Sequence, residues 1–139
     1  MIVKLNTGQI RSGLGVFVLD SDDEEVLIVN CSDETTALTT GLKITFRMPF
    51  GMNDISFRAC LTTAQTAGSI VTANITKSGT TIFSTQLSID NNSSTSVGAT
   101  TPYALSTSTL EDNTEISILI TQVGTSPTGL KIYFYGTTN

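Results

Sequence analysis

Apolar and polar residues alternate along much of this 139-residue chain, and a period of two restricts such runs to extended strands. The clearest run spans residues 42–48, where Leu42, Ile44, Phe46 and Met48 alternate with Lys43, Thr45 and Arg47. The same alternation recurs within residues 55–61, 71–76, 81–87, 116–121 and 130–135. Each run is typical of a strand that buries one face and exposes the other to water.

The spacing of these runs predicts the fold class. Turn-forming residues separate about eight strands at intervals of about 8–14 residues, a pattern typical of sandwiches and jelly rolls. No segment keeps a helical period for more than a turn or two, and the short candidate helix at residues 108–113 fits a turn equally well. A chain of 139 residues suits one domain. We therefore expect an all-β fold, a single antiparallel β-sandwich of jelly-roll type.

Residues 1–41 differ from the rest of the chain in charge and regularity. Two apolar runs, residues 16–19 and 26–29, flank the acidic residues 20–25. This pattern predicts a hairpin with a charged turn, so we expect residues 1–41 to form a short N-terminal arm and residues 42–139 to form the sandwich. An arm of this kind attaches a protein by adding a strand to an exposed sheet edge. The candidate attachment residues are Val16, Phe17, Val18, Val26 and Ile28.

The composition argues against catalysis and against nucleic-acid binding. The chain has no His and two Cys, whereas nucleophilic catalysis needs an activated hydroxyl or thiol beside a base. The net charge is −5 and no basic stripe is present, so the electrostatic signature of a nucleic-acid partner is missing. No apolar run reaches membrane-spanning length. We expect no enzyme activity, no cofactor, no nucleic-acid partner and no membrane partner.

For two further groups of residues we prefer a structural interpretation over a functional one. The acidic residues 20–25 lack the ligand spacing and the turn glycine of a helix-loop-helix calcium site, which favours a hairpin tip in water over a metal site. Cys31 and Cys60 lie in apolar, strand-like surroundings, which predicts buried free thiols rather than a disulfide.

The surface is expected to meet other polypeptides. Charged residues make up only 14% of the chain, so hydroxyl side chains must cover much of the surface, and charge repulsion between copies is weak. Tyr133 and Tyr135 share the outward side of the last strand with Lys131, where they either face water or pack against another subunit. The candidate residues for a subunit interface are Tyr133, Tyr135 and Phe46.

Several segments resemble a known β-rich domain. They include residues 32–41 (SDETTALTTG), 43–50 (KITFRMPF), 58–64 (RACLTTA), 80–85 (TTIFST), 87–90 (LSID), 112–120 and 129–132 (GLKI). Together they are similar to a domain found in virion proteins of tailed bacteriophages, across roughly residues 32–136. The resemblance implies a structural role in a virion that assembles in the bacterial cytoplasm, and it brings no catalytic motif.

The resemblance and the chain length lead to two hypotheses. The first is a homotrimeric capsid decoration, or cement, protein that binds the major capsid protein or another virion protein. The alternative is a tail-fibre or head-fibre module that binds a receptor on the bacterial surface through its polar loops at residues 93–101 and 124–129.

Overall fold

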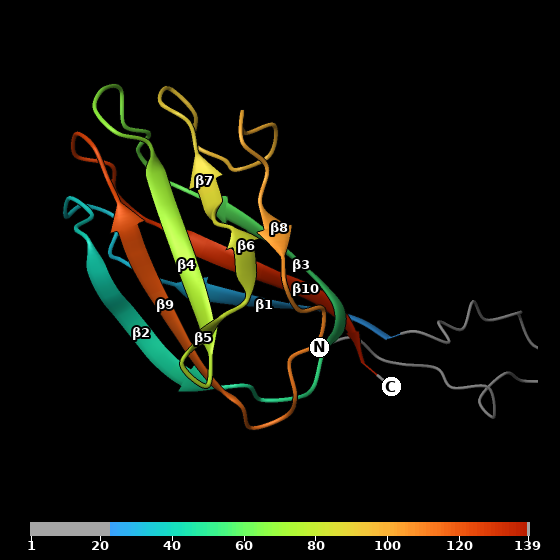
Figure 1. The fold of residues 1–139 in the computed structure, drawn as a ribbon. Helices are drawn as coiled ribbons and strands as arrows, with labels where there is room; N and C mark the ends of the chain where they lie inside the picture. The colour runs from blue at the N-terminus through green and yellow to red at the C-terminus, as the bar shows by residue number, and fades with distance from the viewer. Residues whose placement is uncertain (1–22, 139) are drawn as a thin grey trace, which may run out of the picture.

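The computed structural model describes residues 23–138, and within that range every regular element is a β-strand (Figure 1). The strands are β1 (Asp23–Asn30), β2 (Gly41–Arg47), β3 (Asn53–Cys60), β4 (Val71–Lys77), β5 (Thr80–Thr81), β6 (Phe83–Thr85), β7 (Leu87–Ile89), β8 (Ala104–Leu105), β9 (Glu115–Gln122) and β10 (Lys131–Thr138). The fold is therefore all-β, as the sequence predicts. The region at residues 108–113 contains no helix, and Leu110 instead forms an antiparallel bridge with Met52.

The strands form two main antiparallel layers. One sheet has the order β1–β10–β3, and the other has the order β2–β9–β4–β5, with β7 also paired to β4. Figure 1 shows the second sheet in front and the first behind it. A short third pair joins β6 to β8. The arrangement is sandwich-like, with the first strand paired to the last and β2 paired to β9.

An apolar core fills the space between the layers. The alternation predicted for β3, β4, β9 and β10 is confirmed, because their inward residues are buried. Phe134 of β10 is fully buried, and its ring centroid lies 4.9 Å from that of Phe57 and 6.0 Å from that of Phe46 on the facing sheet. Phe57 also meets Phe83 edge-on at 5.4 Å. This aromatic cluster joins the two sheets.

Two local predictions differ from the structure. Leu42 was expected to point inward with Ile44, but it is 59% exposed, because a register shift between these two residues changes the pairing of β2 with β9. The predicted return strand at residues 81–87 is divided, since β5 and β7 pair with β4 whereas β6 pairs with β8. The turn before it is tight, with positive φ at Ser78 and Gly79.

The described part of the N-terminal segment belongs to the sandwich and is not a separate arm. β1 pairs with β10 along all eight of its residues, from Asp23 opposite Thr138 to Asn30 opposite Lys131. Leu38 and Cys31 are buried, and Ala37 forms a bridge with Thr128. The boundary expected at residue 41 therefore does not separate arm from core. The first half of the predicted hairpin, residues 16–19, lies outside the described residues.

We predict that Phe134→Ala lowers the free energy of unfolding by about 3–5 kcal/mol, because it leaves a cavity between the two sheets. Tyr135→Ala is the matched control on the same strand, since it removes an aromatic ring that points outward. We expect it to cost about 1 kcal/mol. Urea titration followed by circular dichroism measures both values. Equal losses in the two variants would contradict the assigned orientation of β10.

Candidate interaction surface

The outward side of the β1–β10–β3 sheet carries apolar and aromatic side chains at its centre. Strand register places Val26 beside Tyr135 and Tyr135 beside Ser56, and in the next row Ile28, Tyr133 and Arg58 lie side by side. Val26 is 48% exposed and Ile28 is 52% exposed. We call this surface the tyrosine face and define it by Val26, Ile28, Ser56, Arg58, Tyr133 and Tyr135.

The two tyrosines of this face form one aromatic surface. Their ring centroids lie 6.2 Å apart and their planes differ by 17°. The guanidinium carbon of Arg58 lies 5.4 Å from the Tyr135 ring centroid, within the range of a cation–π contact. Arg58 thus extends the face with a planar cationic group that is exposed to solvent.

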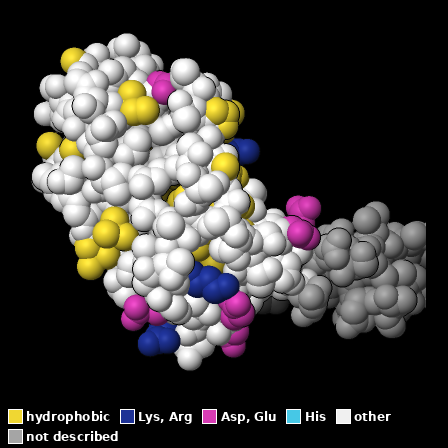
Figure 2. Space-filling view, in the orientation of Figure 1, with side chains coloured by type: hydrophobic (Ala, Val, Ile, Leu, Met, Phe, Trp, Pro, Cys, Tyr) yellow, Lys and Arg dark blue, Asp and Glu magenta, His cyan; other side chains and the backbone are white. Residues whose placement is uncertain are grey.

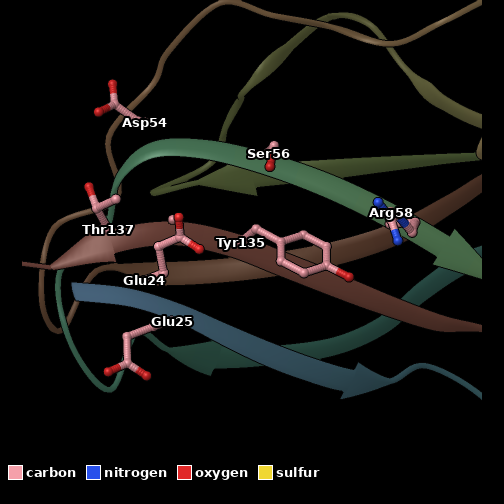
Figure 3. A pocket seen from close by; sticks show the side chains of 8 residues that line it. Glu24, Glu25, Asp54, Ser56, Arg58, Tyr135 and Thr137 are labelled. Atoms are coloured by element: carbon pink, nitrogen blue, oxygen red, sulfur yellow. The ribbon is translucent and has the colours of Figure 1, made fainter. Parts of the chain in front are cut away.

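A shallow hollow of about 310 Å³ lies at one end of the tyrosine face. Its lining includes Glu24 from β1, Asp54, Ser56 and Arg58 from β3, and Tyr135 and Thr137 from β10 (Figure 3). The hollow therefore mixes acidic and basic groups beside an aromatic ring. The ion pairs among residues 23–138 are Lys77–Glu111 and Lys131–Glu34, so neither Asp54 nor Arg58 has an ion-pair partner there.

At the other end of the face, Lys131 forms an ion pair with Glu34. Its Nζ donates to Glu34 Oε1 at 2.6 Å, and this hydrogen bond holds the pKa of Glu34 below its usual value. Thr62 donates a second hydrogen bond to the same carboxylate, which lowers the pKa further. In the described part of this sheet, Arg58 is consequently the basic side chain that is left to meet a partner.

The outward side of the β2–β9–β4 sheet has a different character. Hydroxyl groups pair across its strands, with Thr45 and Ser117 oxygens 2.8 Å apart and Thr72 and Thr121 oxygens 2.6 Å apart. Figure 2 views the molecule from this side and shows apolar atoms in separate small groups on a mostly polar surface. These hydroxyls bond to one another, so they gain little from contact with a partner. Leu42 of β2 is an exposed apolar side chain on this sheet.

A buried glutamine holds three loops together at one end of the sandwich. Gln65 is fully buried, and its amide nitrogen donates to Ser69 O and Asn91 Oδ1, both at 2.6 Å. Its side-chain oxygen accepts from the Gly124 N–H at 2.8 Å. A Cβ at Gly124 would overlap the Ala67 carbonyl, so the loops approach each other closely. The network fixes the loops around residues 65–69, 91 and 124 relative to one another.

Both cysteines are free thiols, as predicted. Cys31 is buried, and burial raises its pKa to about 12. Cys60 is half-buried rather than buried, because it lies on the outward side of β3 with its Sγ 4.0 Å from the Tyr133 hydroxyl.

The structure brings together four of the residues predicted as candidate sites and separates the others. Tyr133 and Tyr135, predicted for a subunit interface, share one face with Val26 and Ile28, predicted for attachment. Phe46 does not join them, because it packs edge-on against Phe134 between the sheets. Val16, Phe17 and Val18 lie outside the described residues. Sequence reasoning did not single out Arg58 or Gln65. The alternation within β3 places Arg58 on the outward side and could have indicated it, whereas no sequence pattern marks Gln65.

The described residues contain no group of three or more His, Cys, Asp or Glu side chains placed to hold a metal ion. No helix in this part of the chain is long and apolar enough to cross a membrane. No protein-family model, no curated protein and no solved structure matches the chain.

We predict that Gln65→Leu lowers the free energy of unfolding by about 1–3 kcal/mol, because it leaves the partly buried Gly124 N–H without its acceptor. Gln122→Leu is the matched control, since Gln122 is exposed and makes one side-chain bond, to Ile70 O. Its expected change is within about 0.5 kcal/mol. Thermal unfolding and amide hydrogen exchange at residues 124–125 measure the effect. Indistinguishable losses from the two variants would refute the role of Gln65.

We predict that iodoacetamide modifies Cys60 of the native protein well before Cys31. The thiolate is the reactive form, and burial both raises the pKa of Cys31 and blocks access to it. Peptide mass spectrometry after timed alkylation measures the order. In urea both thiols should react, which serves as the control. Earlier modification of Cys31 would contradict its buried position.

Proposed function

We propose that this chain is a non-enzymatic structural protein of a tailed-bacteriophage virion, and specifically a capsid decoration protein that acts as a homotrimer. The observation that carries the proposal is the tyrosine face, which presents exposed Val26 and Ile28 beside two tyrosines and an arginine. Tyr and Arg are enriched at protein interfaces, and an apolar centre with a polar rim is the usual interface pattern.

The energetics of this face favour contact with other polypeptides. Fully burying a Val or Ile side chain is worth about 1.5–3 kcal/mol. Val26 and Ile28 are about half exposed, so a partner that covers both side chains gains part of this free energy from each. A decoration protein is bound in many copies, and multivalent attachment strengthens each weak contact. The resemblance to phage virion domains supports the same role.

The strand order supports a jelly roll. In an eight-stranded jelly roll the chain folds as a long antiparallel hairpin that wraps into two layers, so that the first strand pairs with the last and the second with the next to last. Here β1 pairs with β10 and β2 pairs with β9, while β3 and β4 flank β10 and β9 on their other sides. We propose that β5 to β8 form the fifth and sixth strands of such a roll in interrupted form.

The head attachment is assigned to the N-terminal part of the chain. Within the described residues, β1 has a strand neighbour on one side only, whereas residues 94–96 cover the outer edge of β3 through bonds to Ala59 and Leu61. A strand at the edge of the described sheet that carries exposed Val26 and Ile28 suits strand addition to a virion protein.

A second candidate function is a receptor-binding module, favoured by the Gln65 network. This network fixes three loops in place, and rigid loops bind at a lower entropic cost. The polar loops at residues 93–101 and 124–129 would then contact the bacterial surface. The tyrosine face has no role in this alternative, so the two functions predict different sensitive residues.

We predict that Ile28→Asp weakens binding to phage heads about tenfold or more, because it places a charge on β1, the strand that this proposal assigns to head attachment. Leu42→Asp is the matched control, since Leu42 is a similarly exposed apolar residue on the other sheet. Its binding should equal that of the unaltered protein. Co-sedimentation with heads of the phage that encodes the chain measures the affinity. Adsorption to host cells without binding to heads would reject decoration in favour of the receptor-binding alternative.

A further inference from the structure

We infer that the tyrosine face binds the tyrosine face of a second copy of this chain, across a two-fold axis perpendicular to the strands. In this contact Asp54 of each copy lies against Arg58 of the other. The inference rests on the proposed function as a virion assembly protein and names one partner of the tyrosine face. In a decorated shell, such two-fold contacts would join neighbouring trimers to one another.

Two opposite charges on β3 flank one residue in the sequence, and a register shift between Ser56 and Asn53 lies on the Asp54 side. Asp54 precedes Ser56 by two positions and Arg58 follows it by two, and all three line the same hollow. Asp54 and Arg58 are exposed, and neither forms an ion pair within residues 23–138. A strand with an acid at one end and a base at the other is complementary to an antiparallel copy of itself.

The central row of the tyrosine face lies on the proposed axis. Ser56, Tyr135 and Val26 form one row across the three strands. An axis along this row places Val26 over Val26 and Tyr135 over Tyr135 of the other copy, while the charged pairs lie toward the rim. Two sheets packed in this way lie about 10 Å apart, as in an ordinary sandwich. The row of Val26 and Tyr135 thus forms the centre of an isologous interface, while Ile28 of each copy lies over Glu24 of the other.

The alternative two-fold arrangement is electrostatically worse. An axis parallel to the strands would lay β1 of one copy over β3 of the other without reversing their direction. Glu24 would then face Asp54, which brings like charges together, and Arg58 would face Ile28. Opposite charges meet only when the strand direction is reversed, so the perpendicular axis is favoured.

Three acidic side chains, Glu24, Glu25 and Asp54, and one basic side chain, Arg58, line the hollow. A second copy places its own Arg58 against Asp54 and its own Asp54 against Arg58. By symmetry this charge pair forms twice.

The test uses the full-length charge-reversal variants Asp54→Lys and Arg58→Glu. Each variant alone places like charges against each other across the axis, so self-association should weaken about tenfold or more. An equimolar mixture of the two should regain association, because the introduced lysine then meets the introduced glutamate, and the retained Arg58 meets the retained Asp54. The double variant D54K/R58E should also self-associate. Sedimentation velocity over a concentration series, with differently tagged copies for the mixture, measures these affinities.

Two controls keep the outcome interpretable. Arg47→Glu reverses an exposed arginine near the end of β2 in the other sheet and should leave association unchanged. Asp54 has a positive φ of 50°, which an Asn tolerates better than a Lys. If D54K proves unfolded by circular dichroism, D54N and R58Q replace the reversals. Each should then weaken association, and the double variant should be no weaker than either single one.

The inference is overturned if the unaltered protein does not self-associate through this face, if single reversals associate normally, or if the mixture fails to recover. Head binding that persists in any of these cases would leave the proposed function standing with a different partner on the tyrosine face. If the two reversal variants associate with each other as predicted but the unaltered protein does not bind phage heads, the decoration role alone is rejected.

Discussion

The packing of Phe134 against Phe57 and Phe46 determines which side chains of β10 and its neighbouring strands point outward. Phe134 is fully buried between the two sheets, and successive residues of a strand point to opposite sides. Tyr133 and Tyr135 must therefore point outward. The register with β1 and β3 then places Val26, Ile28, Ser56 and Arg58 on the same outward side. The core thus creates the tyrosine face, and a one-residue slip of β10 would bury the tyrosines and expose the phenylalanine.

The two outward sides of the sandwich differ in the groups that they expose. On the β2–β9–β4 sheet, hydroxyl pairs such as Thr45 with Ser117 use their hydrogen-bonding capacity within the chain. On the β1–β10–β3 sheet, the exposed groups are apolar or aromatic, or are charges such as Arg58 without an ion pair in the described residues. Covering these apolar and aromatic groups removes apolar surface from water, which favours contact with another polypeptide.

Sequence reasoning recovered those features that alternate burial dictates. The inward sets of β3, β4 and β9 follow from period-two patterning, because both the buried and the exposed face are recorded in every second residue. The same pattern oriented Tyr133 and Tyr135. It assigned Phe46 to a subunit interface, however, because alternation says which side a residue takes but not whether that side faces the core or a partner.

Other features depend on contacts between distant residues that no local pattern encodes. The pairing of β1 with β10 joins residues about a hundred positions apart, so residues 23–41 read as a separate segment although they complete a sheet. Gln65 lies in a polar loop and resembles its exposed neighbours, yet it is buried by three loops that meet in space. Asp54 and Arg58 of β3 likewise line one hollow with Tyr135 of β10 only because of the strand register.

The central claim is that the outward side of the β1–β10–β3 sheet is the surface that meets other polypeptides. Hydroxyl-radical footprinting tests it directly, because the chain has three tyrosines and Tyr103 packs between Phe57 and Phe83 as an internal reference. The account predicts that oxidation of Tyr133 and Tyr135 falls when the dilute protein assembles, while oxidation of Tyr103 does not change. Unchanged oxidation of Tyr133 and Tyr135 in the assembled protein, with protection confined to the β2–β9–β4 side, would contradict it.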